Sequence, residues 1–470
     1  YIINVNARID GSNEFGSRAN EKLLPIWSFS GRWNIHRDIL KNVNWVNDLA
    51  LRASMGIQGN MIKTVSSQLV LEKGGMNTSF NKFESKIKYF PNKDLRWEKT
   101  NSYNFGLDFS FFQNKINGTV SYYYKQTEDA FLEKTVSEIN GISTYVVNKG
   151  TLRNQGYELS LNFIPIQTGY SRNDFTWRFD PQIGQVLNQL ISKAINNKDK
   201  SLHDEITYQD YLNGKVEIAG RPLNTFFSYK FAGLDAGDGR PMFYNVDEYE
   251  GEGENKVSVR KKYSEITKDE VFQTVMERSG TRVPTIQGGL VNTFSYKGFV
   301  LSVNMTYSLG SKIRLLKLYS QAGNGTLAPQ PIQNVRKEFV HRWRNTGDEN
   351  ITNIPALISN AAYVETQNPW WRDETYTFAD NIWQMYDDSN IRVASGNYLK
   401  LQSFSLRYVV PDEFCRKLAL KSAYLSFTGT NLFTICSRKL KGQEPTQSGS
   451  SDNINLSVRP NYSFSLNVTF

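Results

Sequence analysis

Apolar and polar side chains alternate along several stretches of this chain. In one of them small or polar residues separate five apolar ones, which are Tyr103, Phe105, Leu107, Phe109 and Phe111. Successive side chains of a β-strand point to opposite faces, so this spacing predicts a strand with one apolar and one polar face. The same alternation recurs in the stretches that begin at Tyr157, Phe299 and Phe464. The chain is therefore expected to be all-β.

The length of these stretches separates two kinds of β protein. Several run for about 10 to 13 residues, near what a tilted strand needs to cross a bilayer, whereas soluble strands mostly have about 5 to 6. The polar face carries mainly Asn, Ser, Thr and Gly, which suits a water-filled lumen. Strand edges in lipid leave backbone groups without hydrogen bonds, so such strands must close on themselves. We therefore expect a transmembrane antiparallel β-barrel.

The joins between the predicted strands alternate between short and long. The alternation indicates about fourteen strands, near residues 1–10, 24–35, 46–57, 100–112, 115–127, 154–165, 173–190, 215–219, 224–234, 285–296, 299–310, 397–410, 419–433 and 457–470. Short joins are expected at 113–114, 220–223, 297–298 and 411–418, and long ones near 58–99, 235–284, 311–396 and 434–456. Bacterial barrels have short periplasmic turns and long outer loops, so the long joins are expected to be extracellular.

The composition excludes a helical membrane protein. Charged residues make up 21% of the chain, and no stretch approaches the roughly 18 to 20 apolar residues of a membrane helix. Aromatic residues make up 13%, and these favour both strands and membrane interfaces. The net charge is +9, but Lys and Arg are scattered among acids, which indicates solvated loops and no nucleic-acid partner. No signal peptide opens the chain, so Tyr1 is expected to be an internal or processed start.

Candidate chemistry is sparse. Three His and two Cys, Cys415 and Cys436, are too few for a metal cluster or a disulfide framework, although they could form one disulfide or remain two free thiols. The Asp and Gly residues of 235–239 are better suited to a turn than to a calcium loop, which would need more ligands. No Ser or Cys has a motif that indicates a nucleophile. We therefore expect no catalytic residues, no bound metal and no cofactor.

A series of motifs resembles one family in its own order. Asp94–Thr100, which leads into Asn104–Asp108, is similar to the "L-x-W-E-K-T … N-x-G-L-D" segment of the SusC/RagA family of TonB-dependent transporters. The remaining similar segments are Arg8–Gly16, Asn148–Gly150, Asn154–Leu159, Gly220–Leu223, Gly233–Asp235, Pro284, Gly288–Gly289, Arg342–Trp343, Gly347–Asp348, Ile354–Pro355, Tyr398–Leu401, Pro411 and Gly429–Phe433. Together they extend over nearly the whole chain.

The resemblance implies a fold and a set of partners. Residues 1–470 would be the C-terminal part of a barrel of 22 strands in the bacterial outer membrane, and the plug domain would lie upstream of Tyr1. The family binds a TonB-type energy-coupling protein through an N-terminal segment that is missing from this chain. It also pairs with a SusD-like surface lipoprotein, and its cargo is an oligosaccharide or a peptide. The expected function is therefore active nutrient import.

Two other functions remain open alongside import. A passive porin or a structural barrel subunit would lack the plug, and an outer-membrane enzyme would need a catalytic dyad that the sequence does not offer. Substrate binding is expected from aromatic residues in the longest predicted loop, because flat rings stack on sugars. These residues are Trp370, Trp371, Trp383 and Tyr386. Loop packing or contact with the lipoprotein is the alternative for them. The adjacent Asp387 and Asp388 could bind sugar hydroxyls, but solvated side chains are more usual and are expected here.

Overall fold

A curved antiparallel sheet forms the main body of the protein. The computed structural model describes residues 1–12, 22–62, 65–135, 144–193, 207–253, 257–263, 265–266, 268–319, 334–360, 382–446 and 459–470. The wall strands are, in order across the sheet, β1 (Ile2–Gly11), β2 (Leu23–Asn34), β3 (Val46–Asn60), β6 (Glu98–Phe111), β7 (Ile116–Thr135), β8 (Thr144–Gln167), β9 (Thr176–Gln185), β17 (Ile286–Tyr296), β18 (Phe299–Leu309), β21 (Tyr398–Val409), β22 (Ser422–Cys436) and β23 (Asn461–Thr469). A further strand, β10 (Leu187–Lys193), also pairs with β8 and continues the line of β9. The transmembrane β fold expected from the alternation is confirmed.

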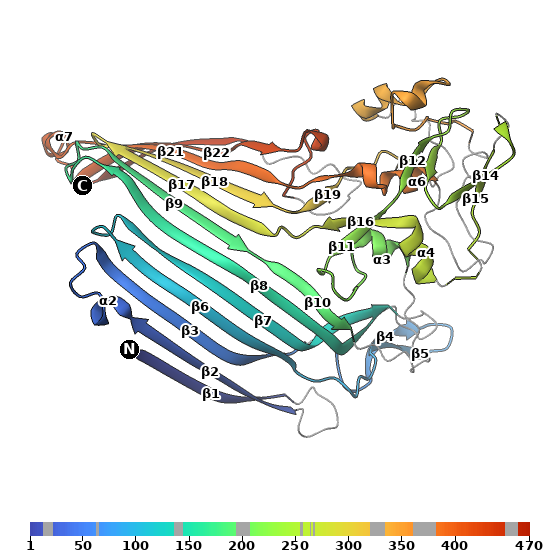
Figure 1. Ribbon diagram of the computed structural model, residues 1–470, viewed down its shortest axis with the longest axis horizontal. Coiled ribbons are helices and arrows are strands. Elements are labelled where there is room, and N and C mark those ends of the chain that lie inside the picture. Colours follow the sequence, from blue (N-terminus) through green and yellow to red (C-terminus); the bar gives the residue numbers. More distant parts are fainter. Residues whose placement is uncertain are drawn as a thin grey trace.

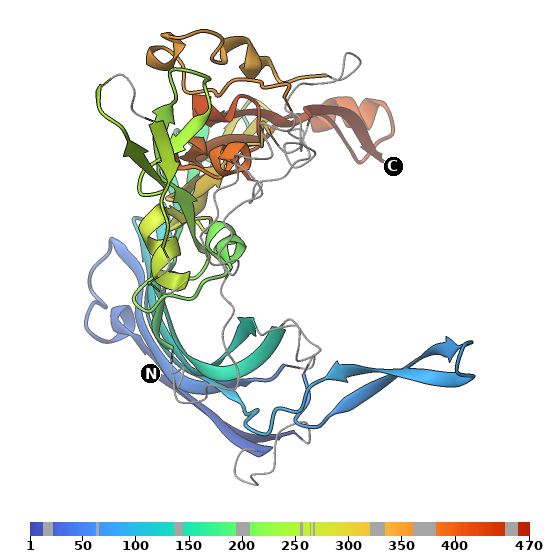
Figure 2. The ribbon, with the colours of Figure 1, turned by 90° about the vertical axis from the view of Figure 1, so that its right-hand side faces the viewer.

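The sheet curves into an arc, with β1 at one edge and β23 at the other (Figure 2). Within the described residues these two edge strands do not pair with each other. Strands β7 and β8 are the longest, with 20 and 24 residues. A tilted strand crosses a bilayer in about 9 to 11 residues, so both extend well beyond the membrane.

The two faces of the wall differ in chemistry along its whole width. The register places Val5 beside Phe29, and Leu406 beside Phe427, so apolar residues form continuous rows from strand to strand. Their side chains remain exposed, by 70% at Val5 and 72% at Phe464. Apolar surface of this extent would be unfavourable in water but suits contact with lipid. The opposite face carries the polar residues that line a barrel's lumen.

Charged residues on the polar face pair with one another, both across strands and, for Arg178 and Asp180 of β9, along one strand. Asp108 accepts hydrogen bonds from Arg32 and Arg52, with an N···O distance of 2.6 Å to Arg32. Arg178 and Asp180 form another pair at 2.8 Å. The polar face therefore has its charges arranged in pairs, as expected for a surface that faces water or another protein segment.

The joins between β2 and β3, β6 and β7, β8 and β9, β17 and β18, and β21 and β22 lie at one end of the sheet. The longest joins, between β3 and β6, β10 and β17, β18 and β21, and β22 and β23, lie at the other end (Figure 1). We call these the turn end and the loop end. The turn end holds the short helices α2 (Ile35–Asp38) and α7 (Asp412–Lys417). The join between β17 and β18 consists of Lys297 and Gly298, both with positive φ, of 48° and 83°. This is the backbone of a two-residue hairpin that follows the twist of the strands.

Two of the fourteen predicted strands do not belong to the wall. Residues 215–219 form no strand, and 224–234 form β11 (Thr225–Tyr229) and β12 (Phe231–Leu234), which pair only in small separate sheets. The predicted short join 220–223 is consequently part of one long join between β10 and β17. Each wall strand carries the chain from one end of the sheet to the other. Because two predicted strands are removed, the remaining joins keep the ends that the sequence predicted for them.

Small elements fill the loop end. They are the strands β4 (Val70–Asn77), β5 (Lys82–Tyr89), β13 (Pro241–Phe243), β14 (Asp247–Glu250), β15 (Val257–Arg260), β16 (Met276–Thr281), β19 (Lys312–Arg314) and β20 (Val393–Ser395), the helices α3 (Tyr208–Asn213), α4 (Lys268–Val275) and α6 (Ile382–Asp387), and the 3₁₀ turns η4 (Lys337–His341), η5 (Asp348–Asn350), η6 (Asn390–Arg392) and η7 (Arg438–Leu440). None of the described helices has the length and apolar character needed to span a membrane.

Candidate functional site: a packed loop domain at one end of the barrel

The largest hydrophobic core among the described residues lies outside the wall. It is built from the long joins between β10 and β17 and between β18 and β21, and we call this unit the loop domain. Its fully buried residues include Tyr211, Tyr229, Phe272, Ile382 and Trp383. The loops are therefore packed into a small globular unit at the loop end.

Local sequence signals explain how the first of these helices forms. The hydroxyl of Thr207 accepts a hydrogen bond from the backbone N–H of Asp210, whose carboxylate accepts one from the backbone N–H of Thr207. This reciprocal pair caps the start of α3, and Gly214, with a left-handed φ of 71°, ends the helix. The helix then buries Tyr211 and Leu212 in the core.

The predicted aromatic binding residues fall into two groups. Trp383 and Tyr386 lie on α6 and are 0% and 1% exposed. The ring of Tyr386 packs edge-on against Phe231 and Tyr319, with centroids 5.7 Å apart in each case. Both side chains are thus part of the core of the loop domain and present no free face for stacking. Trp370 and Trp371 lie outside the described residues.

A buried ion pair joins two parts of the loop domain. Arg314, at the end of β19, is 1% exposed, and its Nη1 lies 2.5 Å from Oδ1 of Asp388. Its Nη2 donates to the carbonyl oxygen of Phe227 at 2.8 Å and to the hydroxyl of Ser228 at 3.2 Å. Removing charges from water is costly unless they are paired and hydrogen-bonded, and this guanidinium has both kinds of partner. It connects the β18–β21 join to the β10–β17 join.

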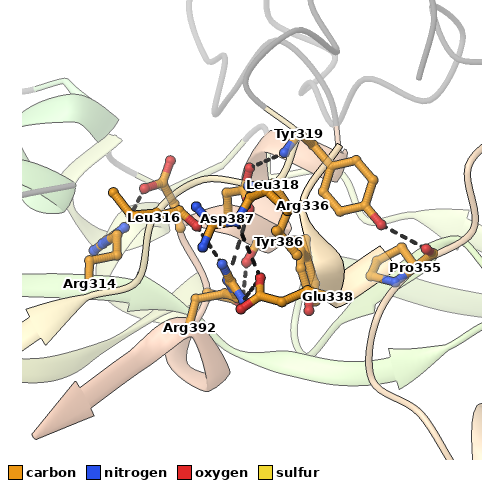
Figure 3. Close-up of polar contacts among 12 residues, drawn as sticks. Arg314, Leu316, Leu318, Tyr319, Arg336, Glu338, Pro355, Tyr386, Asp387 and Arg392 are labelled. Carbon is orange, nitrogen blue, oxygen red and sulfur yellow. Dashed lines mark hydrogen bonds and ion pairs between the residues drawn. The ribbon is translucent and has the colours of Figure 1, made fainter. Parts of the chain in front are cut away.

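A second group of buried charges surrounds Asp387 (Figure 3). Its two carboxylate oxygens accept hydrogen bonds from the backbone N–H groups of Leu318 and Tyr319, at 2.8 and 2.6 Å. Arg392 donates to the carbonyl oxygen of Leu316 and lies 3.6 Å from the carboxylate of Glu338. Asp387 and Asp388 were expected to be solvated, and this is wrong: they are 0% and 6% exposed.

The third long join, between β22 and β23, is attached to the same network. The side-chain amide of Gln443 donates to the carbonyl oxygen of Arg314 at 3.0 Å and accepts from the backbone N–H of Leu316 at 3.1 Å. Glu338 also pairs with Lys441 at 3.3 Å. Three joins that are far apart in sequence are therefore held together by one polar network at the loop end.

The arrangement of these groups is suited to holding a shape. The carboxylates of Asp387, Asp388 and Glu338 each have arginine, lysine or backbone N–H partners. Among the residues that the structure describes, no group of His, Cys, Asp and Glu is placed to bind a metal. Cys415 and Cys436 are free thiols, which decides between the two alternatives left open by the sequence.

The acidic turn at 235–239 has the structure expected of a turn. The carboxylate of Asp235 accepts from the backbone N–H of Gly237 at 2.8 Å, and its carbonyl accepts from Gly239 at 2.9 Å. Gly239 has a left-handed φ of 70°, and an added Cβ would lie 2.3 Å from the ring of Trp343. The glycine thus fits the tight turn and also lets Trp343 pack against it.

A hollow of about 630 Å³ with a mixed polar and apolar lining lies beside the loop end of the wall, among β1, β2, β3 and β6. Its lining contains amide, hydroxyl and guanidinium groups, supplied by Asn6, Arg8, Ser28, Ser54, Gln58 and Asn104. Such groups can donate and accept hydrogen bonds to neutral polar ligands. This hollow is a second candidate for ligand contact. Its polar lining residues are ones that the alternation in the sequence assigned to the polar face of the strands.

Burial raises the pKa of Asp387 to about 7, although Arg392 and the backbone N–H groups of Leu318 and Tyr319 favour its charged form. The folded pKa lies above the ordinary value, so the folded loop domain binds this proton more readily than the unfolded one. The resulting stabilisation is complete below about pH 4 and is lost as the pH rises through about 7.

We therefore expect hydrogen exchange in the loop domain, corrected for its intrinsic rate, to speed up between about pH 5 and pH 7. Asp387→Asn should flatten this dependence, because an amide does not titrate. Asp412→Asn, at an exposed position of the turn end, is the matched control and should leave the dependence unchanged. An unaltered slope in Asp387→Asn would contradict the assignment.

The strands, the two faces and the segregation of the joins define an outer-membrane β-barrel. Residues 2–319 match the family model described as "TonB dependent receptor-like, beta-barrel", and the chain belongs to this family. Its similarity to known members covers most of the chain. It is 25% identical to TonB-dependent receptor P3 of Formosa agariphila, over 96% of this chain and 41% of that protein. It is 24% identical to TonB-dependent receptor SusC of Bacteroides thetaiotaomicron, over 80% of this chain and 37% of that protein.

Solved structures share the fold. The RagAB peptide transporter superposes with a TM-score of 0.70 at 20% identity, over 99% of this chain and 45% of that one. The "closed-closed" state of the RagAB peptide importer gives a TM-score of 0.72. The chain spans about two fifths of the length of the curated relatives it matches. The comparisons confirm a SusC/RagA-like barrel of the outer membrane, as the motif series indicated.

Proposed function

We propose that this chain is the C-terminal barrel portion of an active importer for an oligosaccharide or a peptide. The single observation that carries the proposal is the loop domain: a TonB-dependent receptor barrel whose long joins are packed together at one end by a buried network. A passive pore would gain little from three joins held in a fixed shape there. The hollow near the same end offers hydrogen-bonding groups beside apolar ones, which suits either class of substrate.

The remaining features of the proposal concern orientation and partners. The loop end would be extracellular, because outer-membrane barrels carry their long loops outside. A SusD-like lipoprotein would bind there, and a TonB-type protein would supply energy through a segment outside this chain. Trp370 and Trp371 would contact substrate, and the buried Trp383 and Tyr386 would support them from the core of the loop domain.

Uptake by cells that produce the full-length protein tests this function. A protonophore that abolishes the proton-motive force should reduce uptake of labelled oligosaccharides or peptides at least tenfold, since active transport depends on it. Uptake that is the same with and without the protonophore would instead indicate a passive porin. In the same assay, alanine at Trp370 and Trp371 should raise the substrate concentration for half-maximal uptake. Trp45→Ala, at an exposed tryptophan of the turn end, is the control and should leave it unchanged.

A further inference from the structure

A groove of about 680 Å³ crosses the apolar face of the wall near its turn end. Two small residues form its floor, Gly31 on β2 and Ala53 on β3, which are directly paired in the sheet. Larger side chains stand around them: Trp33 and Leu51 pair on one side, and Phe105 continues the row beyond Ala53. The groove therefore exists because two neighbouring strands both carry a small residue in an otherwise bulky surface.

The floor of the groove is open space. A Cβ atom added at Gly31 would meet no heavy atom within 4 Å. Almost all of the lining is apolar, and the surrounding rows are part of the exposed apolar surface of the wall, the kind of surface that faces lipid in outer-membrane barrels. A groove open to the bilayer interior is filled by hydrocarbon, because leaving it empty forfeits dispersion contacts and water has no polar partners there.

One end of the groove lies at the boundary of the apolar surface. The rings of Tyr1 and Trp33 are stacked there, with centroids 6.3 Å apart, and both side chains donate hydrogen bonds to Asp38 on α2. Aromatic side chains with one apolar and one polar end are typical of the membrane–water interface. The groove thus runs from the hydrocarbon region toward the interface.

Cationic side chains lie just beyond this end. Arg37 on α2 and the following Lys41 are both exposed. Lys41 follows Asp38 by three residues in the same join, and Asp38 accepts the hydrogen bonds of Tyr1 and Trp33 at the end of the groove. A lipid that lies in the groove would bring its headgroup to these two cations.

We propose that the groove binds one acyl chain of a glycerophospholipid, with the lipid phosphate beside Arg37 and Lys41. The apolar lining accounts for the chain, and the position of the two cations at the interface accounts for the phosphate. Gly31 and Ala53 are the residues that make room for the chain. This site is independent of the transported substrate, so it stands whether or not the import proposal is correct.

Native mass spectrometry of the full-length protein tests the proposal with a palmitoyl-oleoyl phosphatidylethanolamine probe. Each displaced methylene weakens binding about fourfold, so Gly31→Leu, which fills the groove, should reduce retention of this lipid on the order of tenfold. Gly75→Leu is the matched control, because its added Cβ also meets nothing within 4 Å and it lies on β4, outside the wall. The gel-mobility shift of a folded barrel on heating verifies that both variants fold.

A second arm tests the headgroup. The double variant Arg37→Glu/Lys41→Glu should weaken retention of the phospholipid but leave that of a diacylglycerol with the same chains unchanged. Equal retention of phospholipid by Gly31→Leu and the unaltered protein would overturn the proposal. So would a disulfide-linked dimer of the Gly31→Cys variant that forms readily in membranes, since a second copy of the chain would then occupy this face.

Discussion

Replacing Arg314 with alanine is expected to destabilise the loop domain by about 3–5 kcal/mol while leaving the wall assembled. The change leaves Asp388, 6% exposed, without its arginine, and removes the donor to the carbonyl of Phe227. A buried charge that loses its partner costs far more than the pair itself contributed. This is the largest effect that we expect from a single substitution in the loop domain.

Hydrogen exchange is the suitable measurement, because a large barrel with a separate loop domain does not unfold as one two-state unit. The expected loss corresponds to exchange of the domain's buried amides that is roughly a hundred to a few thousand times faster. Amides of β17 and β18 should keep their protection. Arg344→Ala is the matched control, since Arg344 is an exposed arginine of the same join and its guanidinium donates to the carbonyl of Val340.

The double variant Arg314→Met/Asp388→Leu separates the effect of the charges from that of the packing. Replacing both partners of a buried pair with apolar residues is often neutral, so most of the lost protection should return. If the single variant changes exchange less than tenfold, the ion pair does not hold the joins together. If the double variant loses as much protection from exchange as the single one, the hydrogen bonds of Arg314 to Phe227 and Ser228 stabilise the loop domain instead of the ion pair.

The wall could be predicted from the sequence because the bilayer imposes a simple rule on it. One face must be apolar and each strand must be long, and β18 meets both conditions over Phe299–Leu309. The same rule failed at 224–234, where strand-like residues are present but both faces are buried: Phe226, Ser228 and Tyr229 are each 0% exposed. When both faces of a strand are buried in a packed domain, its sequence does not show whether the strand belongs to the wall or to the loop domain.

The loop network could not be predicted, because its partners are far apart in the chain. Arg314 pairs with a residue 74 positions away and accepts, at its carbonyl, a hydrogen bond from one 129 positions away. The sequence around Asp387 did contain one local signal. Ile382, Trp383 and Tyr386 recur at helical spacing just before the two acids, which favours a buried helix end over a solvated loop.

Lysine at position 305 is expected to prevent stable insertion of the barrel, whereas lysine at position 304 is expected to be tolerated. Met305 lies on the apolar face of β18, between Leu290 on β17 and Leu401 on β21. A lysine that faces lipid near the bilayer midplane costs about 2–4 kcal/mol. Asn304 lies on the opposite face, where it donates a hydrogen bond to the hydroxyl of Ser403 at 2.8 Å. A charge added there remains in the polar lumen.

The two adjacent positions therefore form a matched pair that differs only in the face of the wall. The folded fraction of the full-length protein in phospholipid vesicles, read from the gel-mobility shift on heating, should fall strongly for Met305→Lys and little for Asn304→Lys. The opposite order would mean that the faces have been assigned the wrong way round, and with them the membrane side of every strand. An equal loss of folded protein in both variants would place β18 outside the bilayer. Adjacent residues of a strand face opposite sides, so lysine at the two positions has different effects only if one side faces lipid.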